Sequence, residues 1–266
     1  MNWQMSLCKK TAVSLAVIID LLFVNNLATL ALKAENQTKE TININKVAQY
    51  VPPRGMSGPR STAGGGTRGN SCSNTQESSN PQLKALVPTV PATNNWAVTV
   101  AANPQFFVYV PKSSAKKAEF VLKDAAQNDI YRANFPISGQ AEIIELRLPK
   151  NTSLQVGQQY SWYFTLFCNS VDRSQNAFTN SWSLRTELNS TLAAQINQAE
   201  PIERYKLYAQ NGIWHEAVAT LAEERRKNPN DPTLATEWKK LLESAGIKDL
   251  VEAPFTLIQL EEAQRN

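Results

Sequence analysis

The chain has 266 residues, of which 42% are hydrophobic and 19% charged, and its formal net charge is +4. This hydrophobic content is enough to form a core, which excludes a wholly disordered protein. So small an excess of positive charge predicts no nucleic-acid partner.

Residues 1–34 have the pattern of a secretory signal peptide. Two lysines at positions 9 and 10 precede the apolar run 13–24, and small residues follow up to Ala34, near which we expect cleavage. The alternative is an uncleaved anchor, but the polar Asp20 leaves the apolar stretch shorter than the roughly 20 residues of a spanning helix. We therefore expect a periplasmic or extracellular protein without a transmembrane segment after cleavage.

Residues 35–80 form a Gly/Pro-rich segment without a sustained hydrophobic period, and we call it the basic arm. It is interpreted as a linker, or as an arm that binds an anionic polymer or membrane surface through Arg54, Arg60 and Arg68. Its glycines at positions 64, 66 and 69 match the dinucleotide-binding spacing, but no buried strand precedes them and no packed helix follows. A turn-forming loop is the better interpretation.

Residues 81–187 show the short runs and turn signals of an antiparallel β-sandwich. In the run 160–168, Tyr160, Trp162 and Phe164 point to one side because alternate residues of a strand share a face, and this face is predicted to be core. The expected strands cover residues 96–100, 106–110, 119–123, 130–134, 142–148, 160–168 and 181–186.

The spacing of Leu154, Gly157, Tyr160 and Trp162 gives the motif L-x-x-G-x-x-Y-x-W. It resembles the corner between two strands of fibronectin-type-III and related immunoglobulin-like sandwiches. The resemblance implies that the leucine fills the core and that the tyrosine ties the corner with a hydrogen bond.

Residues 188–250 change to a helical period, and residues 251–266 are expected to be a C-terminal tail. Prolines at first-turn positions and glycines at stops predict helices over residues 190–199, 201–210, 213–227 and 232–245. The spacing of one tetratricopeptide-like repeat is carried by Tyr208, Gly212, Trp214, Glu216, Ala217 and Pro229. The motif departs from that repeat at Tyr205 and Glu224. Because one repeat does not bury its own faces, the module must pack on the sandwich or on a partner.

The chain also resembles a cyanobacterial family known only as a domain of unknown function, number nine hundred and twenty-eight. The resemblance implies a secreted or periplasmic setting and carries over no catalytic residue. It rests on Pro52-Pro53-Arg54-Gly55, Gly64-Gly65-Gly66-Thr67-Arg68-Gly69-x-x-Cys72, Leu83-x-Ala85-Leu86-x-Pro88, Phe106-x-Val108-Tyr109-Val110-Pro111 and Gly212-Ile213-Trp214-x-Glu216-Ala217.

Two cysteines, Cys72 and Cys168, remain after cleavage, and in an oxidising compartment they are expected to form a disulfide. The alternative is two separate buried thiols. His215, the only histidine, lacks the second histidine of a metalloprotease helix and is interpreted as a surface residue. No metal site, cofactor or serine-histidine triad is predicted.

The remaining chemistry is weighed between a binding protein and an enzyme. Carboxylates that could serve a glycosidase, interpreted as solvated surface acids, are Glu119, Asp124, Asp129, Glu142, Glu145 and Asp172. Tyr163 and Phe167, opposite the core face of their strand, form a candidate ligand face for polysaccharide, unless the basic arm or the helical module covers them. The leading hypothesis is a non-enzymatic interaction or scaffold protein of the cell envelope that docks another envelope protein through Trp214, Trp238 and Tyr208.

Overall fold

The computed structural model describes residues 49–53, 72, 82–90, 95–169, 172, 176–247, 250 and 253–261. All of them belong to the compact unit Val47–Asn266. The expected signal peptide and the arginines Arg54, Arg60 and Arg68 of the basic arm lie outside the described residues.

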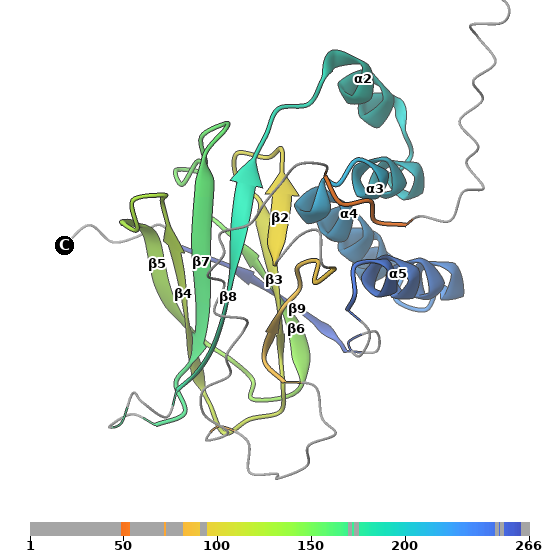
Figure 1. Cartoon of the computed structure of the whole chain (residues 1–266). Helices are drawn as coiled ribbons and strands as arrows, with labels where there is room; N and C mark the ends of the chain where they lie inside the picture. The colour runs from red at the N-terminus through yellow and green to blue at the C-terminus, as the bar shows by residue number, and fades with distance from the viewer. Residues whose placement is uncertain are drawn as a thin grey trace, which may run out of the picture. The chain divides into compact units, whose positions relative to one another are not determined.

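Two packed β-sheets form the first part of this unit (Figure 1). The four-stranded sheet has the order β1-β3-β6-β9, and the five-stranded sheet has the order β2-β8-β7-β4-β5. The strands are β1 (Lys84–Ala85), β2 (Trp96–Thr99), β3 (Gln105–Val110), β4 (Lys117–Lys123), β5 (Asp129–Pro136), β6 (Glu142–Arg147), β7 (Gln159–Leu166), β8 (Ala177–Arg185) and β9 (Phe255–Gln259). Each of the seven strands expected from the sequence overlaps one of the strands β2 to β8.

Strand β7 shows why the sheets pack against each other. Tyr160, Trp162, Phe164 and Leu166 are all buried, as the alternation along the strand predicts. The ring of Trp162 lies 5.3 Å, centroid to centroid, from the ring of Phe106 on the opposite sheet. The predicted core face is therefore confirmed.

The corner before β7 also has the contacts that its motif predicts. Leu154 is fully buried, and the backbone N–H of Gln155 donates a hydrogen bond of 2.7 Å to the hydroxyl oxygen of Tyr160. Gly157 adopts a φ of 75°, a conformation that glycine takes without steric cost. The loop is thus tied to the strand that follows it.

Four helices follow the sheets among the described residues, with bounds that match the expected ones to within one residue. They are α2 (Ser190–Gln198), α3 (Pro201–Gln210), α4 (Trp214–Lys227) and α5 (Pro232–Ser244). The side chains of Asn189 and Asp231 accept hydrogen bonds from the first-turn N–H groups of α2 and α5, which explains where these helices begin.

The helical module is part of the same core as the sandwich. Helix α4 contacts helices α3 and α5 and also strands β2 and β3. Its buried residues Trp214, Val218 and Leu221 join the hydrophobic cluster that contains Phe106. The lone repeat-like hairpin therefore buries its apolar face on the sandwich, which is one of the two outcomes expected for it.

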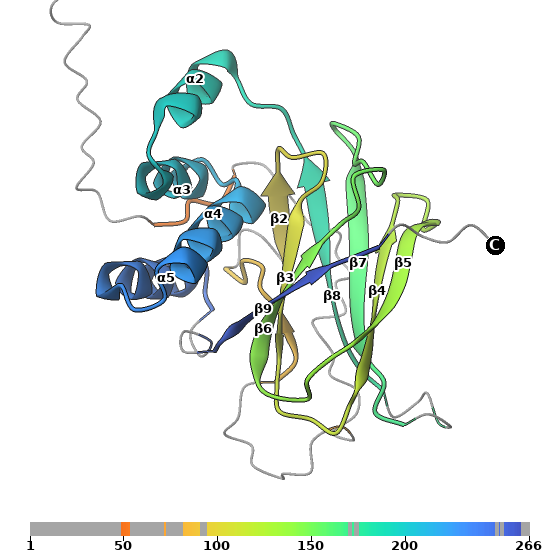
Figure 2. The same ribbon diagram turned by 180° about the vertical axis from the view of Figure 1, so that it is seen from behind.

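The sheet edges differ from the antiparallel sandwich that the sequence predicts. Strand β2 pairs with β8 in parallel, and β9, inside the expected tail, pairs in parallel with β6 (Figure 2). A parallel neighbour requires a long connection. Between β6 and β9 the chain passes through β7, β8 and the four helices, so pairing at this edge depends on how the helical module returns the chain.

The predicted disulfide between Cys72 and Cys168 is confirmed. The two Cα atoms lie 4.9 Å apart, and the bridge joins residues separated by 96 positions. The carbonyl oxygen of Cys72 also accepts a hydrogen bond from the backbone N–H of Ser114. Residue 72 of the basic arm is thus attached just beyond the end of β7.

Candidate binding sites

Two of the three residues expected to dock a partner are core residues. Trp214 is 1% exposed, and its indole N–H donates a 2.8 Å hydrogen bond to the carbonyl oxygen of Leu86. Trp238 is fully buried and packs edge-on against Phe255 of β9, with ring centroids 5.0 Å apart. Only Tyr208 is partly exposed. An exposed docking surface made of both tryptophans is therefore wrong, because the sandwich and Tyr50 cover Trp214 and β9 covers Trp238.

His215 is buried, not a surface residue as the sequence suggests. Its Nδ1 lies 2.9 Å from the carbonyl oxygen of Gln105, and its Nε2 lies 2.9 Å from the hydroxyl of Ser183. A carbonyl oxygen accepts but does not donate, so Nδ1 carries the hydrogen and Ser183 donates to Nε2. Burial lowers the pKa of His215 to about 4. The neutral imidazole bridges β3 and β8 from the start of α4.

Glu216 holds the end of strand β2. Its Oε1 accepts hydrogen bonds from the hydroxyl of Thr99 and from the backbone N–H groups of Val100 and Ala101, the latter two at 3.2 and 3.0 Å. Burial raises the pKa of Glu216, although these hydrogen bonds oppose the shift. Residues 214–216, which we call the junction turn, thus bind four strand regions of the sandwich: the ends of β1 and β2, and strands β3 and β8.

An extended segment of the chain's own N-terminal part lies on the helical module. Figure 1 shows residues 49–53 in orange among helices α3, α4 and α5. The backbone N–H of Tyr50 donates to the hydroxyl of Ser244 at 2.9 Å, and the N–H of Val51 donates to the carbonyl oxygen of Ala209 at 3.0 Å. The Tyr50 ring, 3% exposed, meets Trp214 edge-on with centroids 5.1 Å apart. We call residues 49–53 the Tyr50 segment.

Gly212 allows this close approach. Its φ of 72° is the left-handed conformation that its place after α3 predicts. A Cβ atom there would lie 2.7 Å from Cγ of Pro53 and 2.9 Å from the carbonyl oxygen of Val51. Both the turn and the contact therefore require glycine. Ala209, Gly212, Trp214 and Ser244 together form what we call the peptide surface.

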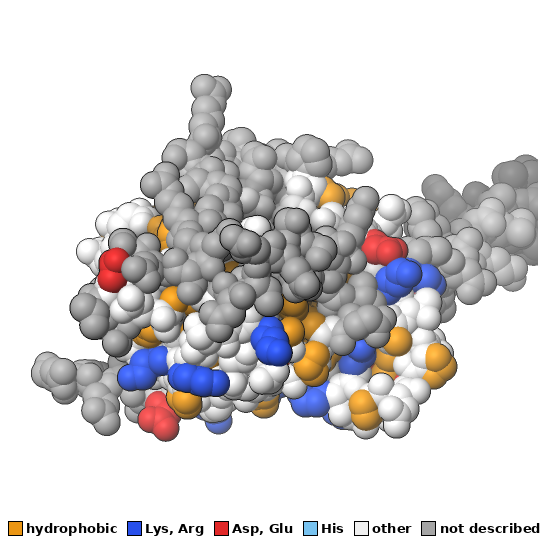
Figure 3. Space-filling view, turned by 90° about the horizontal axis from the view of Figure 1, so that it is seen from below, with side chains coloured by type: hydrophobic (Ala, Val, Ile, Leu, Met, Phe, Trp, Pro, Cys, Tyr) orange, Lys and Arg blue, Asp and Glu red, His pale blue; other side chains and the backbone are white. Residues whose placement is uncertain are grey.

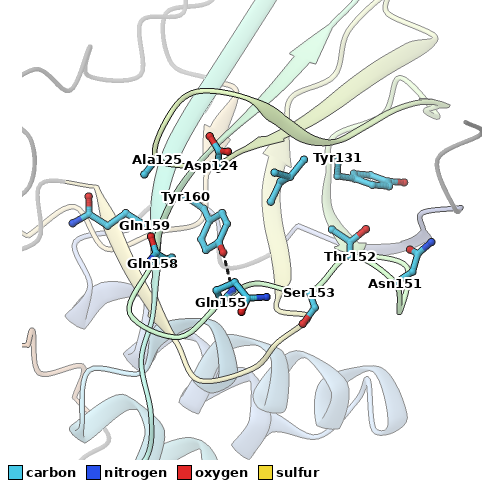
Figure 4. Close-up of a pocket in the computed structure, with 11 residues that line it drawn as sticks. Asp124, Ala125, Tyr131, Asn151, Thr152, Ser153, Gln155, Gln158, Gln159 and Tyr160 are labelled. Carbon is cyan, nitrogen blue, oxygen red and sulfur yellow. Dashed lines mark hydrogen bonds between the residues drawn. The ribbon is translucent and has the colours of Figure 1, made fainter. Parts of the chain in front are cut away.

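A polar cavity of about 620 Å³ lies at one end of the sandwich. Figure 4 shows Asp124 on one side of it and Ser153 and Gln155 on the opposite side. It is lined by Asp124, Ala125, Ile130, Tyr131, Asn151, Thr152, Ser153, Gln155, Gln158, Gln159 and Tyr160. Its amides and hydroxyls donate and accept hydrogen bonds without a formal charge, which suits a hydroxyl-rich ligand. No sequence pattern predicts this end cavity, although residues 151–159 are rich in Asn, Gln, Ser and Thr.

The acids weighed for glycosidase chemistry are engaged in other contacts. Asp124, the one carboxylate of the end cavity, accepts hydrogen bonds from Asn128, and these lower its pKa. Glu119 and Asp129 pair with Arg132 on the outer face. Retaining and inverting glycosidases need two carboxyl groups across a cleft, roughly 5 to 9.5 Å apart. The cavity lining supplies one.

Two further acids lie in the four-stranded sheet. Glu145, fully buried, binds Arg147 beside it and Arg226 from α4, so this ion-pair group links sheet and helix. Glu142 accepts from the hydroxyls of Ser138 and Thr256, which connects β6 with β9. Asp172, the remaining candidate, donates its backbone N–H to the side-chain oxygen of Asn169. Both buried acids therefore hold elements together.

The candidate ligand face lies on the outer side of the five-stranded sheet. Tyr163 is half-buried there, and Phe167 follows the end of the same strand. Strand register places Trp182 and Phe178 of β8 on the same face, and Trp182 stacks on Trp96 with centroids 5.9 Å apart. The structure thus adds Phe178 and Trp182 to the two aromatic residues that were expected on this face.

The described residues show neither a continuous basic surface on the face seen in Figure 3 nor a group of acids, histidines and cysteines arranged to hold a metal. In that view, Lys and Arg side chains lie in small groups with uncharged surface between the groups. None of the helices in the described part of the chain is long and apolar enough to cross a bilayer.

The fold and the sites define a protein built from a two-sheet β region with an attached helical module. The chain belongs to the family described as Domain of Unknown Function (DUF928), which matches residues 63–255. Membership brings no functional assignment. A comparison with curated proteins found no match. The Tyr50 segment and most of β9 lie outside the matched residues.

Proposed function

We propose that this protein is a non-enzymatic interaction component of the cell envelope and that its helical module binds an extended segment of a partner protein. The observation that carries this proposal is the Tyr50 segment, an extended stretch already bound to the peptide surface through two backbone hydrogen bonds and one buried ring. Backbone hydrogen bonds combined with a side-chain pocket are a common mode of peptide recognition.

Two features support the envelope setting and the absence of catalysis. The disulfide suits an oxidising compartment outside the cytoplasm. Ser183 and His215 share a hydrogen bond of the kind that activates a nucleophile, but both side chains are buried between sheet and helix, where no substrate reaches them.

The test is a pull-down from an envelope fraction with the full exported chain and its Tyr50→Ala variant, which weakens the internal contact. We expect the variant to retain more of one partner than the wild type does, and a synthetic peptide of residues 47–53 to displace it. A partner that binds both chains equally and resists the peptide would contradict the proposal, as would the absence of any partner. The variant Lys239→Ala, at an exposed position of α5, is the matched control.

A second candidate function is carbohydrate binding, which the amides and hydroxyls that line most of the end cavity favour. A screen of envelope polysaccharides would measure binding and the release of reducing ends in parallel. We expect Gln155→Ala to weaken any binding and Gln140→Ala, outside the cavity, to leave it unchanged. Loss of binding in Tyr163→Ala but not in Gln155→Ala would place the sugar on the outer aromatic face instead.

A further inference from the structure

Where the Tyr50 segment binds the peptide surface, one of its buried polar atoms has no hydrogen-bond partner among the described residues. The Tyr50 ring is buried against Trp214, but its hydroxyl oxygen has no hydrogen-bond partner among the described residues. A buried hydroxyl without a partner loses its hydrogen bonds to water and gains none in return. The pocket therefore suits an aromatic ring that has no hydroxyl.

The other residues of the segment show which further features a bound peptide needs. Val51 is 50% exposed, so the pocket does not select its side chain, whereas its N–H and carbonyl oxygen face Ala209 and Gly212. Pro53 lies where a Cβ on residue 212 would collide with it, so the peptide surface and the proline are in close contact. Proline also favours the extended conformation of the residue before it, which lowers the entropy lost on binding.

From these contacts we infer that the Tyr50 segment is a displaceable internal occupant and that the external ligand of the peptide surface is a protein segment of the form Phe-x-Pro-Pro. This inference rests on the proposed function, since it names the partner chemistry for the same surface. The internal segment keeps the surface occupied until a segment with a better aromatic residue replaces it. The missing hydrogen bond of Tyr50 makes that replacement favourable.

Fluorescence anisotropy with three labelled peptides tests the inference. The peptides carry residues 47–53 with Tyr, Phe or Ala at the position of Tyr50, and the protein is the full exported chain with Tyr50→Ala, so that its own segment competes weakly. We expect the Phe peptide to bind roughly tenfold more tightly than the Tyr peptide. The Ala peptide should bind far more weakly than both. A Phe peptide with Ala in place of Val51 is the matched control and should bind like its parent.

The wild-type chain supplies the test of internal competition. We expect its affinity for the Phe peptide to be at least several-fold lower than that of the Tyr50→Ala chain, and Tyr50→Phe to lower it further. Circular dichroism and thermal unfolding of each chain establish that the differences do not come from loss of fold. Equal affinities for wild type and Tyr50→Ala would overturn the internal competition.

The two proposals fail in different ways. If the Phe peptide binds no better than the Tyr peptide while the envelope pull-down succeeds, the preference for Phe-x-Pro-Pro is wrong and the proposed function stands. If the Phe peptide binds as expected but no envelope protein is retained and displaced, the peptide surface is real and its proposed role in the envelope is wrong. If no peptide binds the Tyr50→Ala chain, the segment is a fixed structural element and the inference falls.

Discussion

The junction turn and the peptide surface share Trp214, yet they differ in how they hold their partners. At the junction, the side chains of Trp214, His215 and Glu216 each form hydrogen bonds with the sandwich. At the peptide surface, the segment is held by two backbone hydrogen bonds and a ring whose hydroxyl has no partner. The repeat-like hairpin thus uses one face for hydrogen-bonded packing on the sandwich and the adjacent one for the contact that we propose to be replaceable.

The largest expected effect comes from removing the residue that both regions share. Trp214→Ala should lower the free energy of unfolding by about 3–5 kcal/mol, because it leaves a cavity and removes the donor to Leu86. Urea denaturation measures the change. Lys239→Ala, exposed on α5, should cause almost none. A Trp214→Ala chain with wild-type stability would show that the junction is not a packed core.

The second-largest loss of stability is expected from removing the disulfide. This change should lower the stability of the sandwich without altering the peptide surface. Replacing both Cys72 and Cys168 with serine should lower the free energy of unfolding by about 2–4 kcal/mol. Peptide affinity at the helical module should stay unchanged, because neither cysteine is part of the peptide surface. Mass spectrometry of the unreduced wild-type chain should find a linked peptide pair, and two alkylated thiols in its place would refute the bridge.

Acid should weaken the junction through His215. The folded pKa of about 4 lies below the ordinary value of 6.5, so the unfolded chain takes up the proton first as the pH falls. The stability contribution of His215 is complete above pH 6.5 and is lost between about pH 6.5 and 4, at up to about 1.4 kcal/mol per pH unit.

Glu216 changes stability in the opposite direction as the pH falls. Burial raises its pKa, so the folded chain takes up this proton at a higher pH than the unfolded chain does. The comparison with His215→Gln, which keeps a donor and an acceptor but does not titrate, isolates the histidine. Chemical denaturation between pH 4 and 8 should give a flatter profile for the variant. Parallel profiles would mean that the imidazole is not buried in its neutral form.

The smallest effect concerns Gly212 and links the turn to the Tyr50 segment. Gly212→Ala should lower the free energy of unfolding by about 1 kcal/mol through its positive φ, with a further loss from the collision with Pro53. When Tyr50 is also replaced with Ala, the segment is held less firmly and can move away from residue 212. The additional loss of stability from the collision with Pro53 should then largely disappear. An additive double mutant would indicate that the segment does not contact Gly212 in solution.

Local patterns predicted much of the fold for physical reasons that act over short distances. Alternation along residues 160–166 identified a core face, and first-turn prolines with stop glycines placed the four helices to within one residue. The disulfide followed from the expectation that cleavage of the signal peptide leaves only Cys72 and Cys168. Such signals depend on the hydrophobic period of the sequence and on the chemistry of a few residues that are adjacent in it.

The pairing at the sheet edges and the formation of the end cavity depended on contacts between residues far apart in the sequence. Strand β9 has no partner in its own neighbourhood and pairs only because the helices return the chain to β6. The lining of the end cavity comes from two loops and two strands that the corner at Tyr160 brings together. A run of Asn, Gln and Ser residues gives no indication of what lies opposite it.

The sequence by itself determined that an apolar face exists on the helix carrying Trp214 and that the residues around it form a repeat-like hairpin. Only the tertiary structure decided what covers that face: the sandwich over His215, strand β9 over Trp238, and the chain's own Tyr50 over Trp214. Helical periodicity reports which side chains avoid water, but the free energy of their burial is the same whichever apolar partner supplies it. The partner is chosen by chain connectivity and by hydrogen bonds between residues more than 100 positions apart, such as the one from Trp214 to Leu86.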